Sequence, residues 1–139
     1  MRNITLAAVL MTASLTAVAG AKEDAIAHFQ AIAAGDVAAV TAPYGEQAVF
    51  QWVGGPLDGV YQGAESIRGV WEKFTKANGM LALDVDNIAE SANPKGATVT
   101  ANVIFKGKST IKVRYVLTFR ESKLVNETWQ IDPNLGMSY

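Results

Sequence analysis

The hydrophobic residues of this chain change their spacing near Gly79. Before this glycine, most of them recur every three or four positions, as on one face of a helix. After it, they alternate with polar residues, as in strands with one buried face. Because helices that cover one face of a sheet would bury both patterns, we expect an α+β fold. The chain has 139 residues, half of them hydrophobic, which is enough for one domain with a substantial core.

Two helices are expected at the start of this domain. Residues 22–34 place apolar side chains on one face, and Gly35 is suited to end that helix in a left-handed conformation. Asp36 follows as the N-cap of a second, short helix, and Pro43 stops it. We therefore expect a corner between two helices at Gly35 and Asp36.

A third helix and a sheet complete the expected fold. Residues 64–78 have helical spacing, and two short strands, at residues 48–53 and 60–61, precede them. Alternation then predicts an antiparallel meander of four longer strands. Their ranges are residues 81–86, 98–105, 111–119 and 125–131. The expected architecture is three N-terminal helices packed on a curved antiparallel sheet, with an open end in which a small ligand would sit.

The first 21 residues are predicted to be a signal peptide that is removed from the mature chain. Arg2 gives a positive start, residues 4–18 are nearly uncharged and apolar, and small residues precede Gly20. This apolar run is shorter than the roughly 20 residues that span a bilayer, which argues against an uncleaved anchor. We expect cleavage after Ala19 or Ala21, export to the periplasm or the medium of a bacterium, and no membrane contact afterwards.

The composition disfavours several classes of partner. Removal of residues 1–21 takes away Arg2 and no acid, so 11 of the 12 basic residues and all 13 acidic residues remain, with a net charge of −2. The basic residues are scattered, so nucleic acid is not an expected partner. One histidine and no cysteine do not make a zinc site of the usual kind, and thiolate chemistry is excluded. We expect neither a metal nor a cofactor.

The order of these features resembles the nuclear transport factor 2-like superfamily and its SnoaL-like members. The resemblance covers about residues 22–132, and residues 22–139 are assigned to one SnoaL-like domain. It implies a cone-shaped fold, and the superfamily includes isomerases, dehydratases and cyclases beside proteins with a pocket and no known chemistry. The motifs that carry the resemblance are Phe29 before Gly35-Asp36, Tyr61-Gln62-Gly63 before Ile67-Arg68, and Trp129 near the last strand's end.

His28 and Tyr115 are the candidate catalytic residues. His28 is the only histidine, and histidine is the side chain best suited to move protons near neutral pH. In the ketosteroid isomerases that this chain resembles, a catalytic tyrosine stands at the position of His28, and a second hydrogen-bond donor falls near Tyr115. The position is equally consistent with a partly exposed helix histidine beside Phe29. The isomerase's carboxylate base has no match, because no carboxylate lies between Gln47 and Leu57, so steroid isomerisation is not expected.

Three aspartates are possible partners of His28. Asp84 and Asp86 share one strand face, which either looks to water or, in the opposite register, enters the pocket as an acid–base pair. The alternation with Leu83 and Val85 favours the face in water. Asp132 follows the last strand and is favoured as a turn residue before a proline.

The candidate ligand-binding residues are mostly aromatic. Trp52, Tyr61, Trp71 and Trp129 can stack on a flat apolar ligand, although most such residues are core. Arg68 matches a recurrent position of the resembled family and can bind a ligand carboxylate or pair with Glu65 or Glu72.

Three functions follow from these observations. The first is an exported SnoaL-like protein that binds a small apolar molecule in its cone, with Trp52 and Tyr115 lining the cavity. The second is an acid–base enzyme of the isomerase, dehydratase or cyclase type, with His28 as proton shuttle and Tyr115 as donor. The third is a homodimer that pairs through the polar sheet face, of which Thr100, Arg114 and Thr128 are members.

Overall fold

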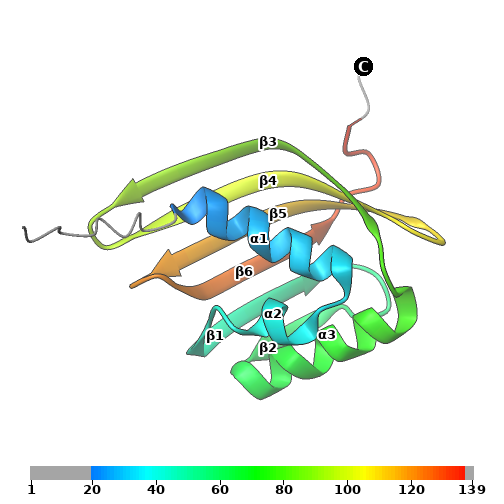
Figure 1. Cartoon of the computed structure of the whole chain (residues 1–139), viewed down its shortest axis with the longest axis horizontal. Coiled ribbons are helices and arrows are strands. Elements are labelled where there is room, and N and C mark those ends of the chain that lie inside the picture. Colours follow the sequence, from blue (N-terminus) through cyan, green and yellow to red (C-terminus); the bar gives the residue numbers. More distant parts are fainter. Residues whose placement is uncertain (1–19, 137–139) are drawn as a thin grey trace, which may run out of the picture.

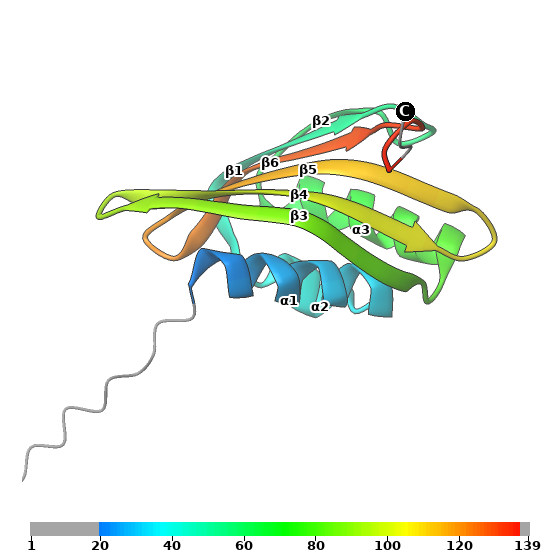
Figure 2. The same ribbon diagram turned by 90° about the horizontal axis from the view of Figure 1, so that it is seen from above.

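The computed structural model describes residues 20–136 and shows three helices on one face of a curved, six-stranded sheet (Figures 1 and 2). The predicted α+β architecture is confirmed. Of the predicted signal peptide, residues 1–21, all but the last two residues lie outside the described residues.

The two N-terminal helices form the expected corner. Helix α1 spans Ala21–Ala34 and ends at Gly35, which has the left-handed φ of 72°. The Asp36 side chain accepts a hydrogen bond of 3.1 Å from the backbone N–H of Ala39, and so caps α2, Val37–Thr41. Both cap predictions are confirmed, and together they fold α2 back beside α1.

The remaining elements follow the predicted order, with one helix between strands. Strand β1 (Tyr44–Val53) and strand β2 (Gly59–Gln62) form a hairpin, which is followed by helix α3 (Ala64–Asn78). The three helices are therefore not consecutive at the N-terminus. The four-stranded meander consists of β3 (Ala82–Asn93), β4 (Gly96–Lys106), β5 (Thr110–Arg120) and β6 (Lys123–Ile131).

One strand pairing departs from the expected antiparallel sheet. The strand order is β2-β1-β6-β5-β4-β3, and β1 runs parallel to β6, with Trp52 opposite Trp129. Local alternation does not show which strands become neighbours, so this pairing could not be predicted. It joins the hairpin to the meander and makes one sheet.

Two strands are longer than the sequence pattern predicted. Strand β1 starts at Tyr44 rather than Ala48, and its pairing with β6 is irregular between Tyr44 and Val49. Strand β3 continues past Asp86 to Asn93 across a second irregularity, where Asn87 has the positive φ of 50°. Such irregularities interrupt the period of two, and this is why the alternation was not recognised there.

The concave face of the sheet and the helices enclose an aromatic core. Phe105 and Trp129 stack with their ring centroids 5.2 Å apart, and Trp52 stacks on the other side of Trp129 at 4.5 Å. Helix α3 adds Trp71 and Phe74, both almost fully buried. The interior around these rings is thus filled by the protein's own side chains.

Candidate functional site

A buried hydrogen bond links α1 to β6. His28 points from the inner face of α1, and Glu127 points inward from β6; they are 3% and 1% exposed. The distance from His28 Nε2 to Glu127 Oε2 is 2.6 Å. The sequence also allowed a partly exposed histidine at this position, and the structure rules that out. A buried imidazole and carboxylate are tolerated here because each satisfies the other.

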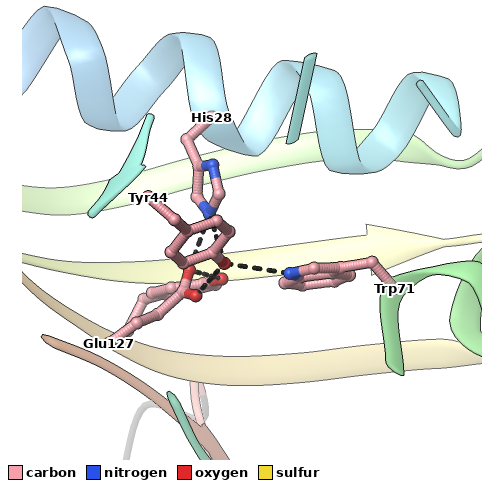
Figure 3. Close-up of polar contacts among 5 residues, drawn as sticks. His28, Tyr44, Trp71 and Glu127 are labelled. Carbon is pink, nitrogen blue, oxygen red and sulfur yellow. Dashed lines mark hydrogen bonds and ion pairs between the residues drawn. The ribbon is translucent and has the colours of Figure 1, made fainter. Parts of the chain in front are cut away.

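Two tyrosine hydroxyls bind the same carboxylate. Tyr115, from β5, donates to Glu127 Oε2 at 2.5 Å, and Tyr44, at the start of β1, donates to Glu127 Oε1. The indole N–H of Trp71 donates to the Tyr44 hydroxyl oxygen at 2.9 Å. Figure 3 shows how His28 and Tyr44 converge on Glu127, with Trp71 approaching from α3. Five residues from five elements therefore form one polar cluster, which we call the Glu127 cluster.

The electrostatics of the cluster keep its two tyrosines protonated. Burial, reinforced by the negative charge of Glu127, raises the pKa of both Tyr44 and Tyr115 well above the usual value of a phenol. Both hydroxyls therefore keep their protons and act as donors to Glu127. A carboxylate has acceptor sites for several donors, and His28 Nε2 also lies within hydrogen-bond distance of it.

The second imidazole nitrogen is left without a partner. His28 Nδ1 is buried and makes no hydrogen bond within the described residues. His28 also lines a hollow of about 410 Å³ between α1 and the segment that joins α2 to β1. We call this the α1–α2 hollow. Nε2 is thus turned to Glu127, while Nδ1 is buried and unpaired.

The predicted catalytic residues meet in this cluster, although not through the expected partners. The ring centroids of His28 and Tyr115 are 6.4 Å apart, and both residues bind Glu127 Oε2. Asp84 instead pairs with Lys106 on the outer side of the sheet, at 2.7 Å. Asp132 accepts a hydrogen bond from the backbone of Asn134 in a turn. Asp84 and Asp132 thus occupy the positions that the sequence favoured, one facing water and one in a turn. Asp86 also lies on the water-facing side and accepts a hydrogen bond from the backbone N–H of Asn87.

The predicted ligand-binding residues are distributed between the core and the surface. Trp52, Trp71 and Trp129 are at most 4% exposed and pack against one another. Tyr61 is partly buried and donates to the Leu57 carbonyl, and Arg68 lies on the exposed face of α3 in an ion pair with Glu72. Their roles in binding stay predictions, while the contacts of Arg68 match the structural alternative.

Sequence analysis missed Glu127 and Tyr44. Glu127 lies two residues before Trp129 and therefore on the same face of its strand. An acidic residue on the apolar face of a strand is a signal that could have identified it. Tyr44 lies before the predicted start of β1, next to Pro43, and carries no such signal. A carboxylate therefore does enter the core, from the last strand rather than from the first.

With this geometry established, comparison with known proteins assigns the family. A sequence model of the SnoaL-like domain matches residues 25–126. The chain belongs to the SnoaL-like domain family. The match includes four of the five residues of the Glu127 cluster. The fifth, Glu127, immediately follows the last matched residue. No curated protein matches the chain.

Solved structures share the fold of this SnoaL-like domain at low sequence identity. A nuclear transport factor 2-like protein of unknown function from Pseudomonas putida has a TM-score of 0.70 at 15% identity, over 86% of this chain and 90% of that one. A protein from the same superfamily in Streptomyces avermitilis, proposed to be a dehydratase, gives 0.66 at 16% identity, over 84% and 96%. A proposed polyketide cyclase from Sinorhizobium meliloti gives 0.54 at 18%, over 78% and 94%. At these identities the likeness concerns the fold alone.

Between residues 20 and 136, no helix is both long and apolar enough to cross a bilayer. In the same part of the chain, no three His, Cys, Asp or Glu side chains are grouped as metal ligands would be.

Proposed function

We propose that this SnoaL-like domain is an acid–base enzyme that acts on a small, largely apolar molecule beside His28. The observation that carries the proposal is the 2.6 Å contact between His28 Nε2 and Glu127 Oε2. A carboxylate bound to one imidazole nitrogen fixes the ring and its tautomer, and leaves the other nitrogen to exchange a proton with a ligand. Binding without chemistry, the other function expected for the cone, does not by itself require this buried pair.

Each member of the Glu127 cluster then has a defined part. His28 Nδ1 takes a proton from the ligand, and the imidazolium that forms is stabilised by the adjacent Glu127 carboxylate. Return of the proton to a different ligand atom completes an isomerisation, dehydration or cyclisation. Tyr44 and Tyr115 are positioning residues, because their hydroxyls hold Glu127 rather than face the ligand. For Tyr115 this proposed role differs from the direct donor that was expected from the sequence.

The first test of this proposal is the tautomer of the only histidine. Protein labelled with ¹⁵N gives a single set of imidazole signals, since His28 is unique in the chain. We expect a protonated Nε2 and an unprotonated Nδ1 at neutral pH. A spectrum with the proton on Nδ1 would contradict the proposed roles of both His28 and Glu127.

A second test separates catalysis from simple binding. Native mass spectrometry of the purified protein identifies any small molecule that travels with the folded form. That molecule is then incubated in D₂O with wild-type protein and with His28→Gln. Deuterium incorporation that depends on His28 supports acid–base chemistry, whereas release of an unlabelled molecule supports binding alone.

Assembly as a homodimer is proposed on separate grounds. None of the helices described between residues 20 and 136 lies on the outer face of the sheet, which carries small, polar, partly exposed side chains at Thr100, Thr118 and Thr128. Arg114 donates to Asn102 on this face at 3.0 Å, so its charge is partly satisfied within the monomer. A second copy could cover such a flat surface. Sedimentation at micromolar concentration tests this, and a monomer throughout would exclude it.

Export is proposed from the N-terminal segment. Helix α1 begins at Ala21, so cleavage after Ala19 leaves the described fold complete. We expect the mature chain in the periplasmic or secreted fraction, and its intact mass should start at Gly20 or Lys22. Retention of residues 1–19 in the exported form would argue against a cleaved signal.

A further inference from the structure

The α1–α2 hollow has the size and lining of a small-molecule site. Its volume of about 410 Å³ lies within the range of roughly 300–1,000 Å³ that ligand pockets occupy. Ala31 of α1, Ala39 of α2, and Ala42 and Pro43 of the following link give it an apolar wall. Because these side chains are short, they leave space that larger residues would fill.

A ligand in this hollow needs a hydrogen-bond donor. His28 lines the hollow, is 3% exposed, and has a buried Nδ1 with no partner among the described residues. Nε2 of His28 is already hydrogen-bonded to Glu127, so a neutral His28 that donates from Nε2 presents a lone pair at Nδ1. A buried acceptor without a partner is destabilising, and a hydroxyl or ammonium group of a ligand would supply the missing donor.

The charges around the hollow discriminate against anions. Asp24, one turn before His28 on α1, is the only permanently charged residue in the lining, which contains no lysine or arginine. Glu127 adds a second carboxylate behind the imidazole. Burial, and then the neighbouring Glu23, raise the pKa of Asp24, so this region already disfavours negative charge. A carboxylate ligand would meet two like charges and no counter-ion.

We infer that the α1–α2 hollow binds a small alcohol or amine, whose donor group bonds His28 Nδ1 and whose apolar body packs on the alanines and Pro43. The inference deepens the proposed function, because it names the ligand class of the same histidine. It also places ligand entry beside α1 and α2 rather than in the aromatic end of the cone, which Trp52 and its neighbours fill.

The test uses three probes that share one ring and differ in their head group: benzyl alcohol, benzylamine and benzoate. Each is titrated into ¹⁵N-labelled full-length mature protein to about 10 mM, enough to saturate a site with a Kd near 1 mM. We expect the alcohol and the amine to shift the Nδ1 signal of His28 saturably, and benzoate to leave it unchanged. Equal binding of benzoate, or no shift with any probe, would overturn the inference.

Two variants establish where the probes bind. Ala39→Leu fills the hollow and should weaken alcohol binding about tenfold or more, whereas Ala38→Leu, on the same helix but outside the lining, should leave it unchanged. Asp24→Asn should weaken amine binding and spare the alcohol. Undiminished binding to Ala39→Leu would place the site elsewhere and refute the inference.

These outcomes are separable from failure of the proposed chemistry. If benzyl alcohol binds as expected but the natural ligand shows no deuterium exchange, the ligand class stands and the enzyme proposal falls. If the free protein has the expected tautomer and none of the probes binds, the enzyme proposal stands and the ligand class falls.

Discussion

His28 Nε2 and Glu127 Oε2 lie 2.6 Å apart, although 99 positions separate the two residues in the chain. Each is buried in a core that is otherwise almost wholly apolar. Removal of Glu127 therefore leaves His28 Nε2 without its carboxylate acceptor, and removal of His28 leaves the buried carboxylate with its two tyrosine donors alone. The pair connects α1 to the sheet as well as providing the proposed acid–base centre.

Glu127→Ala should lower the free energy of unfolding by about 3–5 kcal/mol, because His28, Tyr44 and Tyr115 all lose their common acceptor. Urea denaturation followed by tryptophan fluorescence measures this. The matched control is Glu72→Ala, which removes an exposed pair with Arg68 and should cost less than about 1 kcal/mol. Equal stability of the two variants would show that the Glu127 cluster contributes nothing to the fold.

Tyr44→Phe should destabilise the protein more than Tyr115→Phe. Loss of either hydroxyl removes one donor from Glu127, at a cost of about 1–3 kcal/mol. The Tyr44 hydroxyl also accepts the N–H of Trp71, so that variant leaves a second buried group unpaired. Urea denaturation of both variants gives the difference, and the reverse order would mean that Trp71 finds another partner.

Stability should fall steeply above about pH 10. The pKa of Tyr44 and Tyr115 is raised in the folded state, mainly by burial, so the unfolded chain releases these protons first. In the unfolded chain, phenols ionise near their usual pKa of about 10. Above this pH, each of the two tyrosines lowers the free energy of unfolding by up to about 1.4 kcal/mol per pH unit. The stabilisation is complete below that pH and disappears as the folded-state pKa is approached.

This alkaline loss should be reduced in the double variant Tyr44→Phe/Tyr115→Phe. Urea denaturation at a series of pH values from 8 to 11 compares its slope with that of wild type. Tyr61→Phe is the control, because the Tyr61 hydroxyl bonds the Leu57 carbonyl and does not contact Glu127. An unaltered slope in the double variant would assign the alkaline loss to other groups.

Alanine should have opposite effects at two glycines. A Cβ at Gly96, in the β4 strand, would lie 2.2 Å from the backbone oxygen of Phe119, so Gly96→Ala requires a strand to move. A Cβ at Gly69, inside α3, would meet nothing within 4 Å, and the change should stabilise the helix by about 0.5–1 kcal/mol. Thermal unfolding measures the Tm of each variant, which should fall for Gly96→Ala and rise for Gly69→Ala. A rise in Tm for Gly96→Ala would contradict the close approach of β4 and β5.

Trp52→Ala should damage folding rather than a binding site. Trp52 is 4% exposed and packs against Phe50, Trp71, Phe74 and Trp129, so truncation is expected to cost about 3–5 kcal/mol. In the folded fraction, the binding of benzyl alcohol should persist, since Trp52 does not line the α1–α2 hollow. Loss of binding with full stability would restore the aromatic end of the cone as the ligand site.

The helices were the most predictable part of the structure. The third helix was expected at residues 64–78 and spans the same residues, because its apolar spacing is uninterrupted and a glycine follows it. Strand ends were less predictable, because the irregularities in β1 and β3 break the period of two that reveals a strand. The site was half predicted: His28 and Tyr115 were named, and Glu127 and Tyr44 were not.

The sequence by itself determined which segments form helices and strands, which side of each is apolar, and where Gly35 and Asp36 turn the chain, since spacing and caps are local properties. Only the tertiary structure decided that β1 pairs with β6 and that His28, Tyr44 and Tyr115 all bind the carboxylate of Glu127. Contacts between elements depend on strand order and register, which local periodicity leaves open. The alternation of β6 placed Glu127 inside, and the packing of α1 against the sheet supplied its imidazole partner.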